Sequence, residues 1–567
     1  MEFNRPTPQE LMHWKWQDFK PYYDDLLKTE LSEKNISTWM AQWTQVSEAS
    51  SELFERLYVA TSVNTADEMA EENLKDYMEN TYPQVSEMSQ QLKEKLLKSG
   101  LVPEGFAIPM RNMRAEAALF RKENIALEVE LNQLSIDLDK ILGAQTVQWK
   151  GEEQTARQME IVFRDKDRGE RARGWELTRK RQLEDRQAID ENWVKLFKLR
   201  MQVAKNAGKA SFREYIWEDY KRFDYTPADC MRFHEAIEEV VVPAVNRIAE
   251  KRKQALGIHD LRYYDLFVAT DDEAPLSPFK DADELEEKIS VLFRNVGPQF
   301  GDYFETMRRE GLLDLANRKN KADGAYTTDY SMVKRPFVFG NAVGIHDDVT
   351  TLIHEGGHAF HAFETFNLPF TQQRWTPMEF NEVASMAMEM LAMPYLTKEQ
   401  GGFYSEKDAA RANISHLEEN LRFWPYMAIV DAFQHWAYEN PEGGIDPRAC
   451  DAKWAELEKR FRPHLDWSGF EDVMMTGWHR KHHIHQAPFY YIEYGLAQLG
   501  AGQVWLNALV DQKEAVKKYH HALQLGGTAT LPQLYQAAGV KLAFDAETLG
   551  RVVSTMEEKI AELETKL

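Results

Sequence analysis

Hydrophobic residues recur every three or four positions along most of the chain, which is the spacing of one face of an α-helix. The pattern predicts helices over residues 85–100 and 117–143, each of which ends at a glycine, and further helices over 228–257 and 546–567. A glycine at the end of such a run is typical of a helix C-terminus. We therefore expect an almost entirely α-helical protein.

Residues 325–348 break the helical spacing. They are rich in Thr, Tyr, Val and Phe and are interrupted by Gly and Pro, which predicts one or two short strands. The strand around Gly340 and Gly344 offers an edge to which an extended peptide could add by main-chain hydrogen bonds, although a purely structural hairpin explains the same residues. The predicted fold is therefore mostly α, with one small β-sheet directly before the next helix.

The helix after these strands contains two adjacent glycines, Gly356 and Gly357, in the sequence TLIHEGGHAFHAF. A glycine inside a helix costs about 1 kcal/mol relative to alanine, so the pair needs a compensating gain. His354 and His358 are four residues apart and share one face, with Glu355 offset by one position. This H-E-x-x-H pattern is typical of a zinc protease. We assign Gly357 to close packing with another helix, whereas Gly356 has no equally clear role.

A catalytic zinc ion takes three protein ligands and keeps one position open, so the two histidines need a partner. The best candidate segment is RWTPMEFNEVASMAMEML, where Thr376 and Glu379 predict a capping box at the start of a helix. Glu382 and Glu389 are seven residues apart on one largely apolar face of that helix. A carboxylate on such a face is unfavourable unless it is paired or bound to a metal. We predict Glu382 as the third ligand, with Glu389 either supporting the site or competing for the ligand role.

Three separated segments resemble one family of enzymes. DDVTTLIHEGGHAFH resembles the zinc helix of the thimet-oligopeptidase-like metallopeptidases, written H-E-x-G-H-x-x-H, with Gly357 and His361 at the family's glycine and trailing histidine. FNEVASMAMEM resembles the segment that supplies the third ligand, and PFYYIEYGLAQLGA resembles the tyrosine-rich loop of the oligoendopeptidase F branch. The resemblance covers about residues 195–505. It implies a bilobed, mostly helical metallopeptidase with a deep central channel, zinc on the channel floor and short unstructured peptides as substrates.

The resemblance also implies that a histidine and tyrosines from this loop stabilise the transition state. Matching residue by residue gives His483 and Tyr494 as catalytic residues and Tyr491 as a substrate-binding residue, with Tyr490 as the alternative tyrosine. The family loop varies in length, and four histidines stand within residues 479–485, so this assignment is less direct than that of the zinc ligands. Without the resemblance, these histidines are compatible with a second metal site or with a polar loop.

Charge and composition narrow the range of partners. The formal net charge of −23 repels phosphate backbones and anionic lipids, which argues against nucleic-acid and membrane partners. The chain has two cysteines, Cys230 and Cys450, which cannot make a disulfide framework and are expected to be reduced thiols. The N-terminal sequence lacks the pattern of a signal peptide. We expect a cytoplasmic protein without an obligate protein partner.

The sequence thus predicts a zinc-dependent endopeptidase for short unstructured peptides, with one zinc ion per chain and Glu355 activating a zinc-bound water. Residues 1–190 are expected to form an N-terminal helical region in the channel wall, and residues 191–567 the catalytic region. The alternative within the same superfamily is a carboxypeptidase or dipeptidyl-carboxypeptidase, which needs a cationic clamp such as Arg480 and Lys481 for a free carboxylate. A helical peptide-binding protein without catalysis is the alternative from another class.

Overall fold

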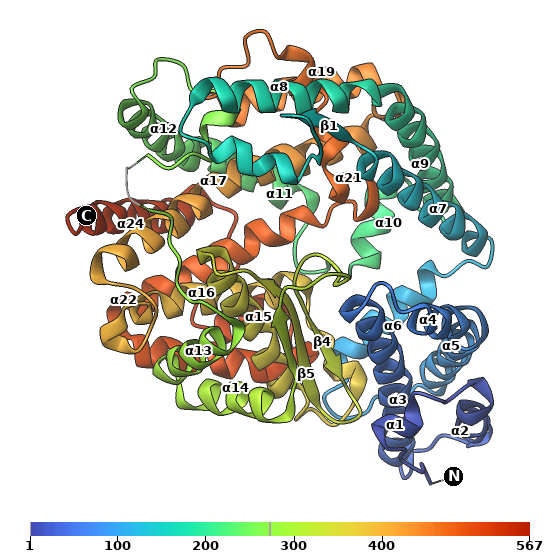
Figure 1. Cartoon of the computed structure of the whole chain (residues 1–567). Helices are drawn as coiled ribbons and strands as arrows, with labels where there is room; N and C mark the ends of the chain where they lie inside the picture. The colour runs from blue at the N-terminus through green and yellow to red at the C-terminus, as the bar shows by residue number, and fades with distance from the viewer. Residues whose placement is uncertain (1, 271–273) are drawn as a thin grey trace.

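The N-terminal helices form a unit with its own hydrophobic core. The computed structural model describes residues 2–270 and 274–567, and Figure 1 shows the first helices, in blue, grouped beside the larger body. Fully buried side chains such as Phe19, Trp39 and Leu92 fill the space between them. The predicted helix end at Gly100 is confirmed, since this glycine has a left-handed φ of 70°. The helices of this unit are α1 (Pro8–Leu11), α2 (Trp16–Lys28), α3 (Ile36–Val63), α4 (Glu68–Asn80), α5 (Tyr82–Ser99) and α6 (Ala107–Leu119).

The helix predicted over residues 117–143 is wrong in its extent, because the chain leaves the helical conformation after α6 and resumes it in α7 (Asn124–Gly143). Between the two helices, Arg121 donates hydrogen bonds to the carbonyls of Asn206 and Ala207, at 3.1 and 3.3 Å. These carbonyls lie at the end of α9 (Arg186–Asn206), where a helix lacks internal partners. The segment therefore supplies hydrogen-bond donors to the last carbonyls of α9 instead of continuing the helix α6.

A β-hairpin that the sequence pattern did not reveal follows α7. Strand β1 (Thr146–Trp149) pairs antiparallel with β2 (Glu152–Thr155), so the described residues form two small sheets and the expectation of one is wrong. Lys150 and Gly151 form the turn with φ values of 54° and 91°, both positive as in a tight two-residue hairpin turn. The strands are short and mostly polar, which leaves too few residues for a clear alternation of hydrophobic positions.

The next helices cross the upper part of the larger body in Figure 1. They are α8 (Arg168–Glu184), α9, α10 (Phe212–Asp219), α11 (Pro227–Ala236) and α12 (Val242–Leu256). A single π-helical turn, Ile237–Val241, joins α11 to α12. The helix predicted over residues 228–257 is therefore confirmed as one continuous helical segment, which ends at Gly257 with a left-handed φ of 63°.

The second sheet lies beside the helix that carries the two histidines. After α13 (Ala282–Val296) and α14 (Pro298–Glu310), the strands β3 (Leu313–Ala316), β4 (Tyr326–Tyr330) and β5 (Arg335–Ala342) are ordered β3-β5-β4. β5 is parallel to β3 and antiparallel to β4. Because β5 is central, the expectation that the strand around Gly340 has a free edge is wrong. The edge strands are β3 and β4, and the backbone of β4 makes no other backbone hydrogen bond within residues 2–270 and 274–567.

The remaining helices build the centre of the larger body. α16 packs against both α15 and α22, and its residues Phe380, Val383 and Ala384 are fully buried in the main hydrophobic core. The helix predicted from residue 546 is confirmed as α24, and so is a mostly α fold. These helices are α15 (His346–Thr365), α16 (Met378–Ala392), α17 (Glu406–Glu439), α18 (Pro441–Gly444), α19 (Pro447–Phe461), α20 (Glu471–Met475), α21 (His482–Gln486), α22 (Tyr491–Leu525), α23 (Leu531–Ala537) and α24 (Ala546–Glu564).

Candidate metal centre and active site

The two glycines of α15 allow it to pack closely against its neighbours. A Cβ atom on Gly357 would lie 2.6 Å from both the Ala384 carbonyl oxygen and the Ser385 Cα of α16. A Cβ atom on Gly356 would lie 2.3 Å from the ring of Phe293 on α13. No side chain fits at such distances. The packing role predicted for Gly357 is confirmed, and Gly356 has an equivalent role on the other side of the helix.

Close packing of α15 and α16 brings the three predicted metal ligands together. The Glu382 Oε2 atom lies 3.5 Å from His354 Nε2 and 3.8 Å from His358 Nε2. A tetrahedral ion with bonds of about 2.0–2.1 Å holds its ligand atoms about 3.3–3.4 Å apart. The donor set of two imidazoles and one carboxylate therefore fits a divalent cation such as zinc with a small adjustment of the side chains.

Glu389 lies behind His354 rather than among the ligand atoms. The His354 Nδ1–H group donates to Glu389 Oε1 at 2.6 Å, which leaves Nε2 free to bind a metal. The other oxygen of Glu389 lies 3.6 Å from Nε2 of His416, on α17. Of the two roles that the sequence left open for Glu389, this geometry favours support of a ligand. His416 was not singled out from the sequence, because it is distant along the chain and belongs to no motif.

Glu355 is buried beside the ligands, and a residue of the second sheet contacts its side chain. The Thr327 hydroxyl, on β4, lies 2.7 Å from Glu355 Oε2 and 3.0 Å from the Glu355 carbonyl oxygen. Burial raises the pKa of Glu355 above its usual range, which is the shift that suits a general base. The sequence did not predict this role of Thr327, since a threonine in a strand gives no indication of such a contact. The contact fixes the free edge of β4 next to the predicted base.

His483 and the tyrosines form an aromatic cluster. The His483 ring centre lies 4.9 Å from that of Tyr491, 5.9 Å from that of Tyr490 and 6.1 Å from that of Tyr494. Burial lowers the pKa of His483 to about 4, so its imidazole is neutral near pH 7. Burial and the field of Glu382 raise the pKa of Tyr494 to about 12, which keeps its hydroxyl protonated. Both rings can therefore offer a hydrogen bond without carrying a charge.

Tyr490 and Tyr491 point to different surroundings. The Tyr490 and Tyr494 rings lie 5.3 Å apart, and the pKa of each hydroxyl is raised by burial and by the Glu382 carboxylate among nearby groups. Burial also raises the pKa of Tyr491, but the groups that act on it include Tyr426 and Tyr494 rather than Glu382. Tyr490 therefore lies with Tyr494 on the side of the metal ligands, and Tyr491 lies further along the cluster.

Two buried arginines hold the backbone of the tyrosine-rich loop. Arg200, on α9, donates to the Ile484 carbonyl at 2.9 Å, directly after His483. Arg222 donates to the Phe489 carbonyl at 2.7 Å, directly before Tyr490. Phe489 has a positive φ of 63°, which is unusual for a residue other than glycine. Sequence reasoning missed both arginines, because nothing local marks a side chain that binds a distant carbonyl.

Comparison with known proteins places the chain in a family. Residues 161–552, more than half of the chain, match the model of peptidase family M3, and residues 9–104 match the peptidase M3 N-terminal domain. The chain belongs to peptidase family M3. Its fold resembles that of PZ peptidase A, solved with an inhibitor, with a TM-score of 0.86 at 26% identity over 100% of this chain and 99% of that one.

This M3 family chain also has relatives at the sequence level. It is 24% identical to oligopeptidase PepF of Bacillus subtilis over 340 residues, which are 58% of this chain and 48% of that protein. It is 24% identical to the plasmid oligoendopeptidase F of Lactococcus lactis subsp. cremoris over 335 residues, 58% of this chain and 53% of that protein. The chain thus spans about half the length of the curated relatives it matches.

The start of α16 differs from the prediction made for it. The capping box of Thr376 and Glu379 is wrong, because α16 begins at Met378 without a side-chain cap. Glu379 instead accepts a hydrogen bond from the Tyr225 hydroxyl at 2.6 Å and lies 3.7 Å from Arg222 Nε. A buried cation attracts the carboxylate more strongly than a backbone N–H does, since charge-assisted contacts are the stronger ones.

Another group of potential metal ligands lies in the core. Ligand atoms of Cys230, Asp431 and His435 are within 4.8 Å of one another. The Asp431 carboxylate accepts a hydrogen bond from His234 at 2.9 Å and lies 3.3 Å from His435. Although burial opposes it, these imidazoles hold the pKa of Asp431 well below its usual range. The bond from His234 engages one Asp431 oxygen, whereas Asp431 Oδ1 and His435 Nε2 are buried without a hydrogen-bond partner in the described structure.

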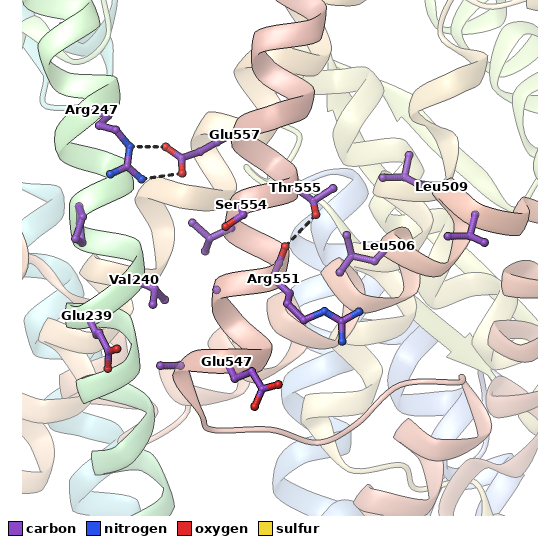
Figure 2. Close-up of a pocket in the computed structure, with 15 residues that line it drawn as sticks. Glu239, Val240, Arg247, Leu506, Leu509, Glu547, Arg551, Ser554, Thr555 and Glu557 are labelled. Carbon is purple, nitrogen blue, oxygen red and sulfur yellow. Dashed lines mark hydrogen bonds and ion pairs between the residues drawn. The ribbon is translucent and has the colours of Figure 1, made fainter.

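A surface hollow in another part of the M3 family fold is unrelated to the metal ligands. Figure 2 shows this hollow, about 860 Å³ in volume, between α24, α22 and the segment around Val240. Arg247 and Glu557 pair across one end of it at 2.7 Å, and Leu506 and Leu509 lie on one wall. It contains neither histidine nor cysteine. Every helix in the described ranges is too short or too polar to cross a lipid bilayer.

Proposed function

We propose that the protein is a zinc-dependent endopeptidase that hydrolyses short unstructured oligopeptides. The observation that carries the proposal is the convergence of His354, His358 and Glu382 beside the buried Glu355. Membership of peptidase family M3 supports a peptide-hydrolysing role, and two relatives are named as oligopeptidases. Action in the cytoplasm, one zinc ion per chain and the absence of an obligate partner stay predictions.

His354, His358 and Glu382 would hold the zinc ion. Bound zinc supplies a Lewis acid that polarises a peptide carbonyl and lowers the pKa of a water molecule towards about 7. The Glu389 carboxylate keeps the His354 proton on Nδ1 and so presents Nε2 to the ion. The Ser385 hydroxyl, 3.1 Å from Glu382 Oε2, orients the third ligand in the same way.

Glu355 acts as the general base. Its Oε2 takes the proton of the attacking water and passes it to the amine of the leaving peptide. Burial raises the pKa of Glu355, so the carboxylate holds a transferred proton better than an exposed glutamate does. The Thr327 hydroxyl keeps Oε2 oriented between these two transfers.

Tyr494 and His483 stabilise the charge that develops on the carbonyl oxygen. Tyr494 stays protonated up to about pH 12, and its hydroxyl is close enough to Glu382 for that carboxylate to affect its pKa. One oxyanion donor is worth about 2.7–4 kcal/mol in the transition state. The Tyr490 ring, 5.3 Å from that of Tyr494, packs against the same donor. Tyr491 lies further along the cluster, where it would contact the bound peptide.

The free edge of β4 is the docking strand for the peptide. An extended peptide can add to such an edge by main-chain hydrogen bonds, which recognise the extended backbone rather than particular side chains. Thr327 on β4 contacts Glu355, so a peptide on this edge passes beside the base. The enclosed channel implied by the family resemblance, with residues 1–190 in its wall and residues 191–567 as the catalytic region, would limit substrates to short flexible chains.

Metal analysis combined with peptide cleavage tests the proposal. The purified protein should contain one zinc ion and cut an internally quenched fluorescent peptide whose two ends are blocked. A chelator should abolish cleavage, and added zinc should restore it. If only peptides with a free C-terminus were cut, the carboxypeptidase alternative would hold. If peptides bound to a zinc-loaded protein and stayed intact, the non-catalytic alternative would hold.

A further inference from the structure

Phe489, the residue directly before Tyr490, has a backbone conformation that its side chain disfavours. Its φ is 63°, in the left-handed region, where residues other than glycine are uncommon and bulky ones are outliers. Such a backbone persists only where the surrounding structure holds it, and it occurs most often at functional sites. The contacts that hold Phe489 therefore bear on the tyrosines that follow it.

Buried side chains bind both backbone polar groups of Phe489. Its N–H group donates to Gln434 Oε1 at 2.7 Å, and its carbonyl accepts from Arg222 at 2.7 Å. Gln434, on α17, is fully buried, and its own NH2 group donates to the Val430 carbonyl one helical turn earlier, at 3.1 Å. This second bond fixes which end of the Gln434 amide faces Phe489. The backbone of Phe489 is thus held from two sides.

The Phe489 side chain packs among aromatic rings, two of which come from the same helix as Gln434. The Phe489 ring centre lies 5.1 Å from that of His435, 5.5 Å from that of Tyr438 and 5.9 Å from that of Trp217. Tyr438 follows Gln434 by four residues and His435 by three, so these three residues share one face of α17. One helix face therefore holds both the backbone and the side chain of Phe489.

Phe489 is joined directly to the tyrosines that are predicted to bind the oxyanion. Tyr490 is the next residue, and α22, which carries Tyr494 in its first turn, begins after it. Glu493 accepts from Arg222 at 2.5 Å, so the guanidinium that holds the Phe489 carbonyl also holds this first turn. A rotation of the Phe489 backbone would consequently turn the start of α22 and move both tyrosine hydroxyls.

We propose that Gln434 is a positioning residue for the oxyanion donors, because its bond to the Phe489 N–H holds the backbone conformation that directs the Tyr494 and Tyr490 hydroxyls at the reacting carbonyl. The inference rests on the proposed peptidase function, and within it on the role of Tyr494. Donors that are already in place cost no reorganisation in the transition state. A misplacement of about 1 Å can cost about 100-fold in rate.

Kinetics of Gln434→Met test the proposal. Methionine is similar in length but cannot accept the Phe489 N–H, so the left-handed backbone loses one of its two holds. We expect kcat to fall at least about tenfold and KM to stay within about twofold, because the donors act mainly in the transition state. A phosphinic analogue of the peptide, whose tetrahedral group imitates the transition state, should bind at least about tenfold more weakly. Either kcat or the analogue affinity within twofold of the unaltered protein would overturn the proposal.

Gln434→Glu separates positioning from stability. Its carboxyl group keeps an oxygen that can accept the Phe489 N–H, so kcat should stay within about threefold of the unaltered protein. Burial disfavours the carboxylate, so the thermal midpoint should fall at least as far as in Gln434→Met. If kcat instead followed the thermal midpoint through both variants, the role of Gln434 would be structural and the proposal wrong.

Gln503 offers a matched control, because it makes the same two kinds of bond elsewhere in the fold. Its Oε1 accepts from the Lys541 N–H at 3.1 Å, and its Nε2 donates to the Leu499 carbonyl one turn earlier at 3.3 Å. Gln503→Met should leave kcat and KM unchanged. Hydrogen–deuterium exchange of the metal-free proteins tests the hold itself, since the segment that contains Phe489 should exchange faster in Gln434→Met and at the unaltered rate in Gln503→Met. Unaltered exchange in both variants would contradict it.

A double-mutant cycle separates this inference from the proposed function. If Gln434 acts through Tyr494, adding Gln434→Met to Tyr494→Phe should lower kcat by at most about threefold more, since the donor is already absent. A further tenfold loss would show that Gln434 acts on something else. A large loss in Tyr494→Phe with none in Gln434→Met would refute only the positioning role. Absence of any effect in Tyr494→Phe would refute the oxyanion role of that tyrosine and this inference with it.

Discussion

Replacing Gly357 by alanine would force the metal-binding helices apart. The new Cβ atom would lie 2.6 Å from both the Ala384 carbonyl oxygen and the Ser385 Cα. Non-bonded carbon atoms pack at about 3.5–4.0 Å, so the two backbones must separate locally by about 1 Å. Ser385 follows Glu382 by one helical turn, and the displacement is therefore passed to a metal ligand. Metal–ligand distances tolerate only about ±0.2 Å.

The Gly357→Ala variant should consequently bind zinc at least about tenfold more weakly, because a ligand displaced by more than the tolerance binds poorly. The free energy of unfolding of the metal-free variant should change only modestly, because two effects oppose each other. Overpacking costs about 1–3 kcal/mol, and the helix propensity of alanine returns about 1 kcal/mol. Titration of the metal-free variant with zinc, in competition with a chromogenic chelator, measures the affinity. The thermal midpoint of the same sample measures the stability.

Gly356→Ala is the matched control for this test. Its Cβ would meet the Phe293 ring at 2.3 Å, on α13, and not the backbone of the ligand helix α16. We expect it to lower the thermal midpoint while zinc affinity falls less than in Gly357→Ala. Zinc affinity of Gly357→Ala within twofold of the unaltered protein would refute the reasoning, since the helix spacing would then not control the third ligand.

Further predictions follow from the same geometry. Glu355→Gln should retain zinc and lose at least about 100-fold in kcat, because the ligands remain and the base does not; full activity with bound zinc would contradict the role of Glu355. Tyr494→Phe should lower kcat and kcat/KM together by about 100- to 1000-fold, whereas Tyr491→Phe should act mainly on KM; the reverse pattern would exchange their roles. Glu382→Ala should weaken zinc binding more than Glu389→Ala, as titration of both metal-free variants can show. The acidic limb of kcat/KM should lie above the usual range of a glutamate, because burial raises the pKa of Glu355 and activity is lost as pH falls through that pKa; a limb near pH 4 would argue against Glu355 as the base.

The part of the site that lies within single helices could be predicted from the sequence. His354 and His358 share a face because they are four residues apart, and the structure holds their ligand atoms together. Glu382 could be selected because a carboxylate on an apolar helix face is unfavourable unless it is paired or bound to a metal. In both cases the helix itself fixes the relative positions, so spacing along the chain translates directly into geometry.

Contacts between distant segments could not be predicted in this way. Thr327 approaches Glu355 only because β4 pairs with β5, and the order β3-β5-β4 is not encoded in any one strand. The same order made the edge around Gly340 unavailable. The capping box of Thr376 failed for a related reason, since a local propensity was overridden by a tertiary contact of Glu379.

Arg222 shows how such contacts set the distance between the two halves of the proposed mechanism. Its side chain is 1% exposed, and it donates to the Phe489 carbonyl at 2.7 Å and to Glu493 at 2.5 Å. It also lies 3.7 Å from Glu379, which precedes the ligand Glu382 by three residues on α16. Glu493 directly precedes Tyr494 on α22. One guanidinium thus ties the helix of the third metal ligand to the residues before Tyr490 and Tyr494.

A buried charge of this kind is weak evidence for stability, because desolvation offsets most of the attraction. Its rigid fork is better suited to fixing a separation, which the tyrosine hydroxyls need if they are to meet an oxyanion formed beside Glu382.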